Sequence, residues 1–277
     1  MNEILYNKLS QLKTLIKERE KIAIAFSGGV DSTFLLKIAK DTLTNNNVVA
    51  VTAKNMLMPE NEFIESKKLA ELIGVRQIVI ETDEAIMGNE NIKNNKHDRC
   101  YHCKKINFSK IKEVSRNLGY KYVADGSNLD DTKEYRPGFK ALYENGIISP
   151  LIDAHLTKIE IREISKELKL PTWDKPSFSC LATRFPYNTN LTKESLIRVE
   201  KAENYIKKFD VNQLRIRSHN NDIAIIEVTE NDFNKILDNK KDIVNKLREI
   251  GYKYIALDIE GYYSGKINRQ LEIKNEY

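Results

Sequence analysis

The chain has 277 residues, of which 41% are hydrophobic and 31% charged, with 13 Tyr and 9 Phe. This composition excludes a disordered chain, because its apolar surface can offset the entropy cost of ordering, and no apolar run approaches the roughly 20 residues that cross a bilayer. The net charge of +5 permits an anionic ligand or an RNA partner and requires neither. The first 20 residues lack the apolar stretch of a secretion signal, so we expect a cytoplasmic protein.

The first part of the chain alternates short apolar runs with helical patterns. Four runs read as strands: Ile22–Phe26, Val48–Ala53, Gln77–Ile80 and Lys121–Ala124. Helical spacing of apolar residues predicts helices over 3–18, 32–43, 61–73 and 108–118. Short continuous apolar strands separated by helices are typical of a parallel sheet covered on both faces. The pattern therefore predicts an α/β fold with a doubly wound, mostly parallel sheet.

The pattern changes near residue 190. A helix is predicted over Leu191–Phe209, opening at Thr192, and then two alternating strands, Gln213–Arg217 and Ile223–Val228, are joined as a hairpin. A helix over Asn231–Ile250 and a strand over Tyr252–Leu257 complete the series. We therefore expect two domains, residues 1–188 and a smaller α+β domain of residues 189–277.

The strongest local signal is the string Ser-Gly-Gly-Val-Asp-Ser at residues 27–32, between the first strand and the helix after it. Glycines let backbone N–H groups approach an anion, and a helix N-terminus adds partial positive charge. No lysine follows the glycines as in a Walker A loop, so the string suits a pyrophosphate that leaves as a unit better than a transferred γ-phosphate. An ordinary glycine-containing turn is the plainer interpretation, and the full string argues against it.

This string resembles the pyrophosphate loop of the ATP pyrophosphatases, a superfamily with an adenine nucleotide α-hydrolase fold. The resemblance implies that the protein uses ATP to adenylate an oxygen and expels pyrophosphate, with Mg²⁺ near Asp31. It extends to the segment 125–128, Asp-Gly-Ser-Asn, which with a strand end would frame adenine and ribose. The ATP-binding residues that it implies are Ser27, Gly28, Gly29, Asp31, Ser32, Ala53, Lys54 and Gly126.

The three cysteines lie in two motifs flanked by cations. Cys100 and Cys103 form a C-x-x-C that precedes the predicted helix at residue 108, and Cys180 lies between Pro176 and Pro186 in a predicted loop. The spacing of the pair fits a zinc knuckle, which His97 or His102 could complete, a redox site or chance. Cys180 alone could be an inert buried thiol. Three thiolates on one metal site would leave a position open for catalysis.

Several motifs together are similar to those of the LarE-type ATP-dependent sulfur transferases. They are Ser-Gly-Gly-Val-Asp-Ser, Arg-Cys-Tyr-x-Cys-Lys, Ala-Asp-Gly-Ser-Asn-x-Asp-Asp, Arg136-Pro137-Gly138 and Pro-Ser-x-x-Cys-Leu-Ala-x-Arg, and they span essentially the whole chain. The resemblance implies adenylation of a carboxylate of pyridinium-3,5-biscarboxylic acid mononucleotide and its conversion to a thiocarboxylate, a step in making the nickel-pincer nucleotide cofactor.

One branch of this family sacrifices the sulfur of a lone cysteine, and another holds a 4Fe–4S cluster on three cysteines, with an extra sulfide on the free iron. Because this chain has the three-cysteine pattern, the resemblance places it in the cluster branch, with Cys100, Cys103 and Cys180 as ligands. The sulfur would then come from an external sulfide donor. Relatives form hexamers, which implies a homo-oligomer.

The resemblance also assigns residues to the mononucleotide. Arg215 and Arg217 alternate on one strand and so point to one face, where they would clamp phosphate or carboxylate. Glu200 and Glu227 are further substrate-site candidates, and Arg184 and Lys175, beside Cys180, would neutralise the adenylate. The plainer interpretation of the strand and helix residues is a solvated face with surface ion pairs.

Other functions stay open at this point. A tRNA thiolase uses the same loop and often a cluster, although the chain has no strongly basic stripe or added RNA-binding module. An amidotransferase-type ligase shares the fold but gives three thiols no role. A zinc-stabilised nucleotide-binding module is the non-catalytic interpretation. Substrate-dependent AMP release and metal analysis distinguish these possibilities.

Overall fold

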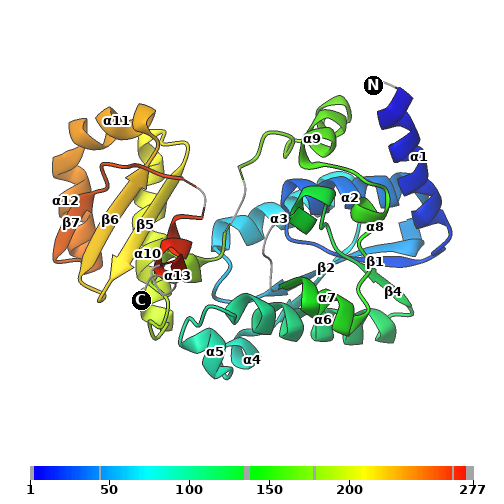
Figure 1. Ribbon diagram of the computed structural model, residues 1–277, viewed down its shortest axis with the longest axis horizontal. Helices are drawn as coiled ribbons and strands as arrows, with labels where there is room; N and C mark the ends of the chain where they lie inside the picture. Colours follow the sequence, from blue (N-terminus) through cyan, green and yellow to red (C-terminus); the bar gives the residue numbers. More distant parts are fainter. Residues whose placement is uncertain (1–2, 44, 134–137, 177–178, 264, 273–277) are drawn as a thin grey trace. The chain divides into compact units, whose positions relative to one another are not determined.

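The computed structural model describes residues 3–43, 45–133, 138–176, 179–263 and 265–272, and it divides into two compact units (Figure 1). The first unit comprises residues 1–89 and 98–178, and the second comprises residues 90–97 and 179–277. Residue 188, where we expected the domain boundary, lies inside the second unit. Within the described ranges, no helix is both long and apolar enough to span a membrane.

The first unit is built on a four-stranded parallel sheet in the order β3-β2-β1-β4. Its strands are β1 (Ile22–Ala25), β2 (Val48–Lys54), β3 (Gln77–Glu81) and β4 (Tyr122–Ala124). Each matches its predicted apolar run to within one residue, and the α/β fold class is confirmed. The chain runs outward from β1 to β3 and then places β4 on the other side of β1, so the carboxyl ends of β1 and β4 flank a topological switch point.

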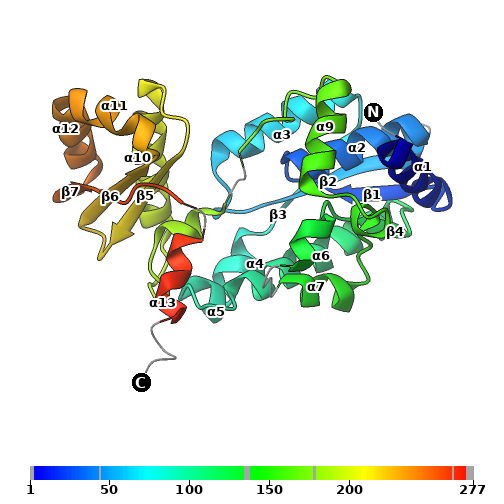
Figure 2. The same cartoon turned by 45° about the horizontal axis from the view of Figure 1, so that its top comes forward.

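Helices cover both faces of this sheet, as Figure 2 shows. They are α1 (Glu3–Lys17), α2 (Val30–Thr42), α3 (Glu60–Ile73), α4 (Asp83–Met87), α6 (Arg99–Asn117), α7 (Gly138–Asn145), α8 (Pro150–Asp153) and α9 (Lys158–Glu167). Ile22 and Ile24 of β1 pack with α1, α2 and α9, whereas Ala23 between them packs with α6 and α7. Alternate residues of one strand thus meet two apolar layers, which is why the strand reads as a continuous apolar run.

Helix α6 begins nine residues before the helix that we predicted, at Arg99 instead of Phe108. The prediction relied on apolar periodicity, and residues 99–107 are mostly polar on a helix that has only four buried residues. No proline or glycine interrupts the chain from Arg99 to Leu118, so nothing in the local sequence opposes helix. The C-x-x-C therefore lies on the first turns of α6 and not ahead of a helix.

The second unit contains a three-stranded sheet in the order β5-β6-β7. Its elements are α5 (Glu90–Lys93), α10 (Lys193–Ile206), β5 (Leu214–His219), β6 (Ile223–Val228), α11 (Phe233–Asp238), α12 (Lys240–Ile250), β7 (Tyr254–Leu257) and α13 (Arg269–Glu272). The predicted hairpin is confirmed, since β5 and β6 are antiparallel, and Asn220 and Asn221 turn between them at positive φ. Thr192 caps α10 as predicted, accepting a hydrogen bond from the Ser195 N–H.

The single helix predicted over residues 231–250 is wrong, because Asn239 separates α11 from α12. The backbone of Asn239 leaves the helical region, at φ −101° and ψ 15°. Its side-chain amide donates to the Lys235 carbonyl oxygen at 2.8 Å. Asparagine side chains compete with helical hydrogen bonds in this way, which explains the break.

Residues 90–97 join the second unit through Asn95. Its buried side-chain amide nitrogen lies 3.3, 3.0 and 2.8 Å from the carbonyl oxygens of Ala182, Phe185 and Pro186. The Asn188 N–H in turn donates to the Asn95 carbonyl oxygen at 3.1 Å. The stretch that follows Cys180 is therefore fixed by a residue that precedes the C-x-x-C in sequence.

Candidate active site

The string Ser-Gly-Gly-Val-Asp-Ser turns from β1 into α2 at the switch point. Gly28 has φ +74°, and a Cβ built on it would lie 2.9 Å from the Ser66 Cβ on α3. Gly28 therefore satisfies a backbone conformation and a close approach that other residues cannot. The Ser27 and Ser32 hydroxyls lie 3.1 Å apart and bond to each other. The first N–H groups of α2 have no helical carbonyl to bond, as an anion site requires.

Replacing Gly28 with alanine should destabilise the protein by about 1–3 kcal/mol, from left-handed strain and from the overlap with Ser66, and should abolish ATP binding. Gly29→Ala is the matched control, since Gly29 has an ordinary φ of −78° and its Cβ would meet only the Ser27 Oγ, at 3.4 Å. Urea unfolding and nucleotide titration measure the two effects. Equal unfolding midpoints for the two variants would contradict this account of Gly28.

The loop after β4 contacts the first turn of α2. A Cβ on Gly126 would lie 2.8 Å from the backbone nitrogen of Ser32, so a side chain here would push this loop away from α2. Asp125 before it is buried, which raises the pKa of its carboxyl, and it accepts hydrogen bonds from the Ser127 and Ser149 hydroxyls. The predicted adenine- and phosphate-binding segments are thus brought together.

Lys54 and Ala53 lie at the carboxyl end of β2. The Lys54 ammonium lies 3.2 Å from a Glu60 carboxylate oxygen and 4.4 Å from the centre of the Phe63 ring. Ala53 and Lys54 lie at the same edge of the sheet as the glycine loop, and doubly wound folds bind their ligands at this edge.

Asp31 lies in the first turn of α2 and has two different carboxylate oxygens. Oδ2 is 2.6 Å from the Lys158 ammonium, whereas Oδ1 is buried and has no hydrogen-bond partner among the described residues. Burial raises the pKa of this carboxyl, against the lowering effect of Lys158. A buried carboxylate oxygen without a partner is suited to a hard cation such as Mg²⁺.

Lys175, predicted to act beside Cys180, contacts the phosphate loop within the first unit. Its ammonium lies 2.7 Å from a Glu62 carboxylate oxygen, 2.8 Å from one of Glu65 and 3.3 Å from the Gly28 carbonyl oxygen. The Arg162 guanidinium holds this segment by donating to the carbonyl oxygens of Trp173 and Lys175. Lys175 therefore links the loop to α3.

The cysteines lie in different units. Cys100 is exposed and Cys103 half-buried on α6 of the first unit, where the Asn107 amide donates to the Cys103 Sγ at 3.5 Å. Cys180, half-buried, belongs to the second unit and precedes a 3-10 turn, Leu181–Arg184, in a stretch that we predicted to be loop only. Ser177 and Phe178 of its motif, and Arg136 and Pro137 of another, lie outside the described residues.

The three thiols belong to different units, and their convergence stays a prediction. Within the described residues there is no group of three or more His, Cys, Asp or Glu side chains arranged to hold a metal ion. Cys100 and Cys103 are three residues apart on a helix, so they share one face.

Arg184 lines a pocket of the second unit, described below, and its guanidinium is also engaged by protein groups. Its guanidinium pairs with both carboxylate oxygens of Glu203 at 2.9 and 3.0 Å, with both side chains buried. Its Nη1 donates to the Ser179 carbonyl oxygen at 2.8 Å and lies 3.3 Å from that of Cys180. Glu203 also accepts from the Ile216 N–H at 3.0 Å. This geometry fixes the Cys180 turn to α10 and β5, and the predicted role of Arg184 at the adenylate stays a prediction.

Sequence reasoning named Glu200 and missed Glu203. Both lie on α10, where Glu200 is half-buried and Glu203 is 4% exposed. The helical spacing of the sequence could have indicated Glu203, because it lies on the same helix face as Val199 and Ile206, which are both fully buried. A carboxylate at a core-facing position requires a cationic partner.

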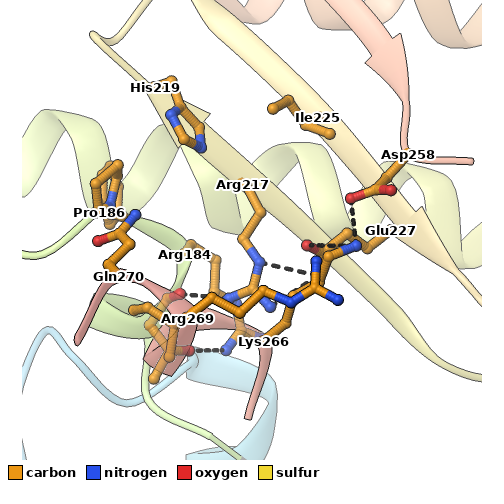
Figure 3. A pocket seen from close by; sticks show the side chains of 13 residues that line it. Arg184, Pro186, Arg217, His219, Ile225, Glu227, Asp258, Lys266, Arg269 and Gln270 are labelled. Carbon is orange, nitrogen blue, oxygen red and sulfur yellow. Dashed lines mark hydrogen bonds and ion pairs between the residues drawn. The ribbon is translucent and has the colours of Figure 1, made fainter. Parts of the chain in front are cut away.

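A pocket of about 220 Å³ in the second unit contains two predicted substrate residues (Figure 3). Arg217 on β5 and Glu227 on β6 line it and form an ion pair at 2.7 Å. Lys266 lies 3.8 Å from the other Glu227 oxygen and also pairs with Asp258. His219 lines the pocket too, and burial lowers its pKa with a further contribution from Arg217. The pocket thus has both donors and acceptors for a polar, anionic ligand.

Arg215 shares the face of β5 with Arg217, as its alternation predicted, because Leu214, Ile216 and Ser218 are the buried residues of the strand. Its guanidinium lies over the Tyr262 ring, 5.1 Å from the centre, and Arg215 is not among the residues that line the pocket. The structure therefore brings Arg217 and Glu227 together and places Arg215 beside them on the same sheet face.

A glycine loop at the switch point of a doubly wound parallel sheet, followed by a helix with an acid in its first turn, defines a nucleotide-binding α/β protein of the PP-loop class. A family model of the PP-loop domain matches residues 1–135. The chain therefore binds ATP.

Known proteins match the chain over nearly its whole length. It is 36% identical over 267 residues to the pyridinium-3,5-bisthiocarboxylic acid mononucleotide synthase of Lactiplantibacillus plantarum, covering 96% of each chain. An uncharacterised protein of Synechocystis is 40% identical to this chain and covers 97% of it. An uncharacterised protein of Methanocaldococcus jannaschii is 34% identical to this chain and covers 94% of it. The match includes 99% of each of these two relatives. The chain belongs to the LarE-type family of ATP-dependent sulfur transferases.

Proposed function

We propose that the protein adenylates a carboxylate of pyridinium-3,5-biscarboxylic acid mononucleotide and converts it to a thiocarboxylate, releasing AMP and pyrophosphate, in nickel-pincer nucleotide synthesis. The observation that carries this proposal is the 36% identity, over 96% of each chain, to the synthase of that name. Adenylation replaces a poor leaving group, oxide, with AMP, so that sulfur can displace it.

ATP is proposed to bind across the carboxyl edge of β1, β2 and β4, on Ser27, Gly28, Gly29, Asp31, Ser32, Ala53, Lys54 and Gly126. The contact of Gly126 with the Ser32 backbone supports one continuous site. Mg²⁺ fits beside Asp31, whose Oδ1 is buried without a partner among the described residues. When bound, the cation would neutralise charge on the phosphates and on the leaving pyrophosphate.

The mononucleotide is proposed to bind through Arg215, Arg217, Glu200 and Glu227. The pocket lined by Arg217 and Glu227 supports two of these assignments. Arginine binds phosphate and carboxylate through two parallel hydrogen bonds. Glu227 forms an ion pair with Arg217 at 2.7 Å, so an incoming anion has to compete with that carboxylate. Arg184, proposed as catalytic from sequence, fits better as a positioning residue for Cys180.

The sulfur-handling group is proposed to be a 4Fe–4S cluster on Cys100, Cys103 and Cys180. Thiolates are the ligands that such clusters use, and a three-cysteine set leaves one iron free to carry a sulfide. Residues 97–98 and 178–179 are points where the chain passes from one unit to the other, and every cysteine lies within six residues of one of them. An external sulfide donor is proposed to renew the sulfur, and the protein is proposed to form a homo-oligomer.

The test is AMP release by the anaerobically prepared protein with ATP, Mg²⁺ and sulfide, run in parallel with the pyridinium mononucleotide and with bulk tRNA. We expect AMP only with the mononucleotide, over many turnovers, together with thiocarboxylate product. AMP release with tRNA would identify a tRNA thiolase instead. Iron and zinc analysis of the same preparation distinguishes a cluster from a zinc site.

A further inference from the structure

A lysine distant in sequence contacts the acid of the phosphate loop. The loop has no lysine after its glycines, yet the Lys158 ammonium lies 2.6 Å from Asp31 Oδ2. Lys158 is the first residue of α9, a helix that was absent from the sequence prediction. It brings to the loop a positive charge of the kind that a Walker A lysine supplies locally.

The backbone of Lys158 is firmly held. Thr157 and Glu160 form a reciprocal capping box at the start of α9. The Lys158 N–H donates to an Asp130 carboxylate oxygen at 2.9 Å. Ile161 and Ile164 anchor the helix in the core. The side chain is 28% exposed, so its root is fixed while its four-carbon stem can change rotamer.

Two other cations near the loop, Lys175 and Arg162, are engaged by protein groups among the described residues. Lys175 is 13% exposed and lies between the Glu62 and Glu65 carboxylates. Arg162 uses both terminal nitrogens on carbonyl oxygens. Lys158, in contrast, has Asp31 as its carboxylate partner, and that carboxylate is the one that fits Mg²⁺.

We propose that Lys158 is a further catalytic residue, which neutralises Asp31 in the nucleotide-free protein and donates to the β- and γ-phosphate oxygens of ATP when Mg²⁺ occupies Asp31. This inference rests on the proposed function. A divalent cation on the carboxylate would repel an ammonium held there, and the phosphate oxygens of a nucleotide bound at the loop would be anions for it to pair with. In the adenylation step an oxygen of the substrate carboxylate bonds to the α-phosphorus, and the bond between the α-phosphorus and the oxygen that bridges to the β-phosphorus breaks. Its electron pair leaves with pyrophosphate, which Lys158 stabilises without transferring a proton.

The test compares Lys158→Met with wild type in calorimetric titrations of pyrophosphate, ATP and AMP, each with excess Mg²⁺. We expect pyrophosphate and ATP to bind about 10- to 100-fold more weakly, because one charge-assisted hydrogen bond is lost. AMP should bind within twofold of wild type. Lys158→Arg should restore most of the pyrophosphate affinity. Lys166→Met, which removes an exposed charge from the same helix, is the matched control and should bind all three ligands normally.

The outcomes separate the two proposals. Unchanged pyrophosphate binding by Lys158→Met would overturn the phosphate role, and equal weakening of AMP and pyrophosphate would reduce Lys158 to a structural residue. If wild-type protein binds neither ATP nor pyrophosphate, the proposed function itself fails. Thermal unfolding of each variant confirms that the fold is intact.

Discussion

Cys180→Ser protein should form no thiocarboxylate, while retaining ATP binding and substrate-dependent release of pyrophosphate. Serine nearly matches the size of cysteine, so the 3-10 turn at Leu181–Arg184 should persist, but a hydroxyl is a poor ligand for iron compared with a thiolate. The thiocarboxylate is measured by mass spectrometry, and the cluster by iron content and the absorbance of anaerobic protein. We expect loss of product formation to below detection.

Cys100→Ser and Cys103→Ser are the matched variants, and each should lose the cluster and the product as Cys180→Ser does. The pattern would be different if Cys180 were consumed as a sulfur source. Cys100→Ser and Cys103→Ser would then remain active for one turnover, and Cys180 would lose the mass of its sulfur. That result would contradict the cluster proposal and would not affect the proposed ATP-binding residues.

Glu203→Ala should lower the free energy of unfolding by about 3–5 kcal/mol, because it leaves the buried Arg184 charge without its partner. Arg184 is 3% exposed and Glu203 is 4% exposed, so water cannot replace the lost carboxylate. The Ile216 N–H also loses its acceptor. Urea unfolding followed by circular dichroism measures the loss. The Cys180 turn should loosen, which faster alkylation of the Cys180 thiol would report.

Glu249→Ala is the control, since it breaks an ion pair between exposed residues, Lys246 and Glu249 on α12. Exposed pairs are screened by water and contribute little, so its unfolding midpoint should stay near that of wild type. The double variant Arg184→Met with Glu203→Leu should recover part of the stability but not the slow alkylation of Cys180. If Glu203→Ala is as stable as Glu249→Ala, the buried Arg184–Glu203 pair contributes no more to the free energy of unfolding than an exposed ion pair does.

The strands of the first unit and the phosphate loop could be predicted because their signals are local. A fully buried parallel strand is a short apolar run whatever its neighbours are, and the glycines of the loop specify their own backbone. The start of α6 could not be found in this way, because its first two turns are polar and have no apolar period. The break at Asn239 depends on one side-chain hydrogen bond, which periodicity does not register.

The partners of the charged residues needed tertiary structure. Lys158 lies 127 residues from Asp31 in the chain, and nothing in either local sequence indicates their contact. The capping residues Thr157 and Glu160 are recognisable in the sequence and indicate the start of α9, but they do not indicate that Lys158 contacts Asp31. The role of Arg184 at the adenylate is predicted from its nearness to Cys180 in the sequence. Its ion pair with Glu203 on α10 depends on the tertiary structure and has no signal in the local sequence.

The hydrogen bonds of Asn95 make the second unit discontinuous in sequence. A fragment that ends at residue 178 would keep residues 90–97 but lose the carbonyl groups that hold them, and a fragment that begins at residue 179 would lack Asn95 altogether. Neither fragment therefore contains all the residues of the second unit. Functional dissection of this enzyme calls for point substitutions in the full-length chain, and an exchange of its C-terminal part between relatives should include residues 90–97 as well.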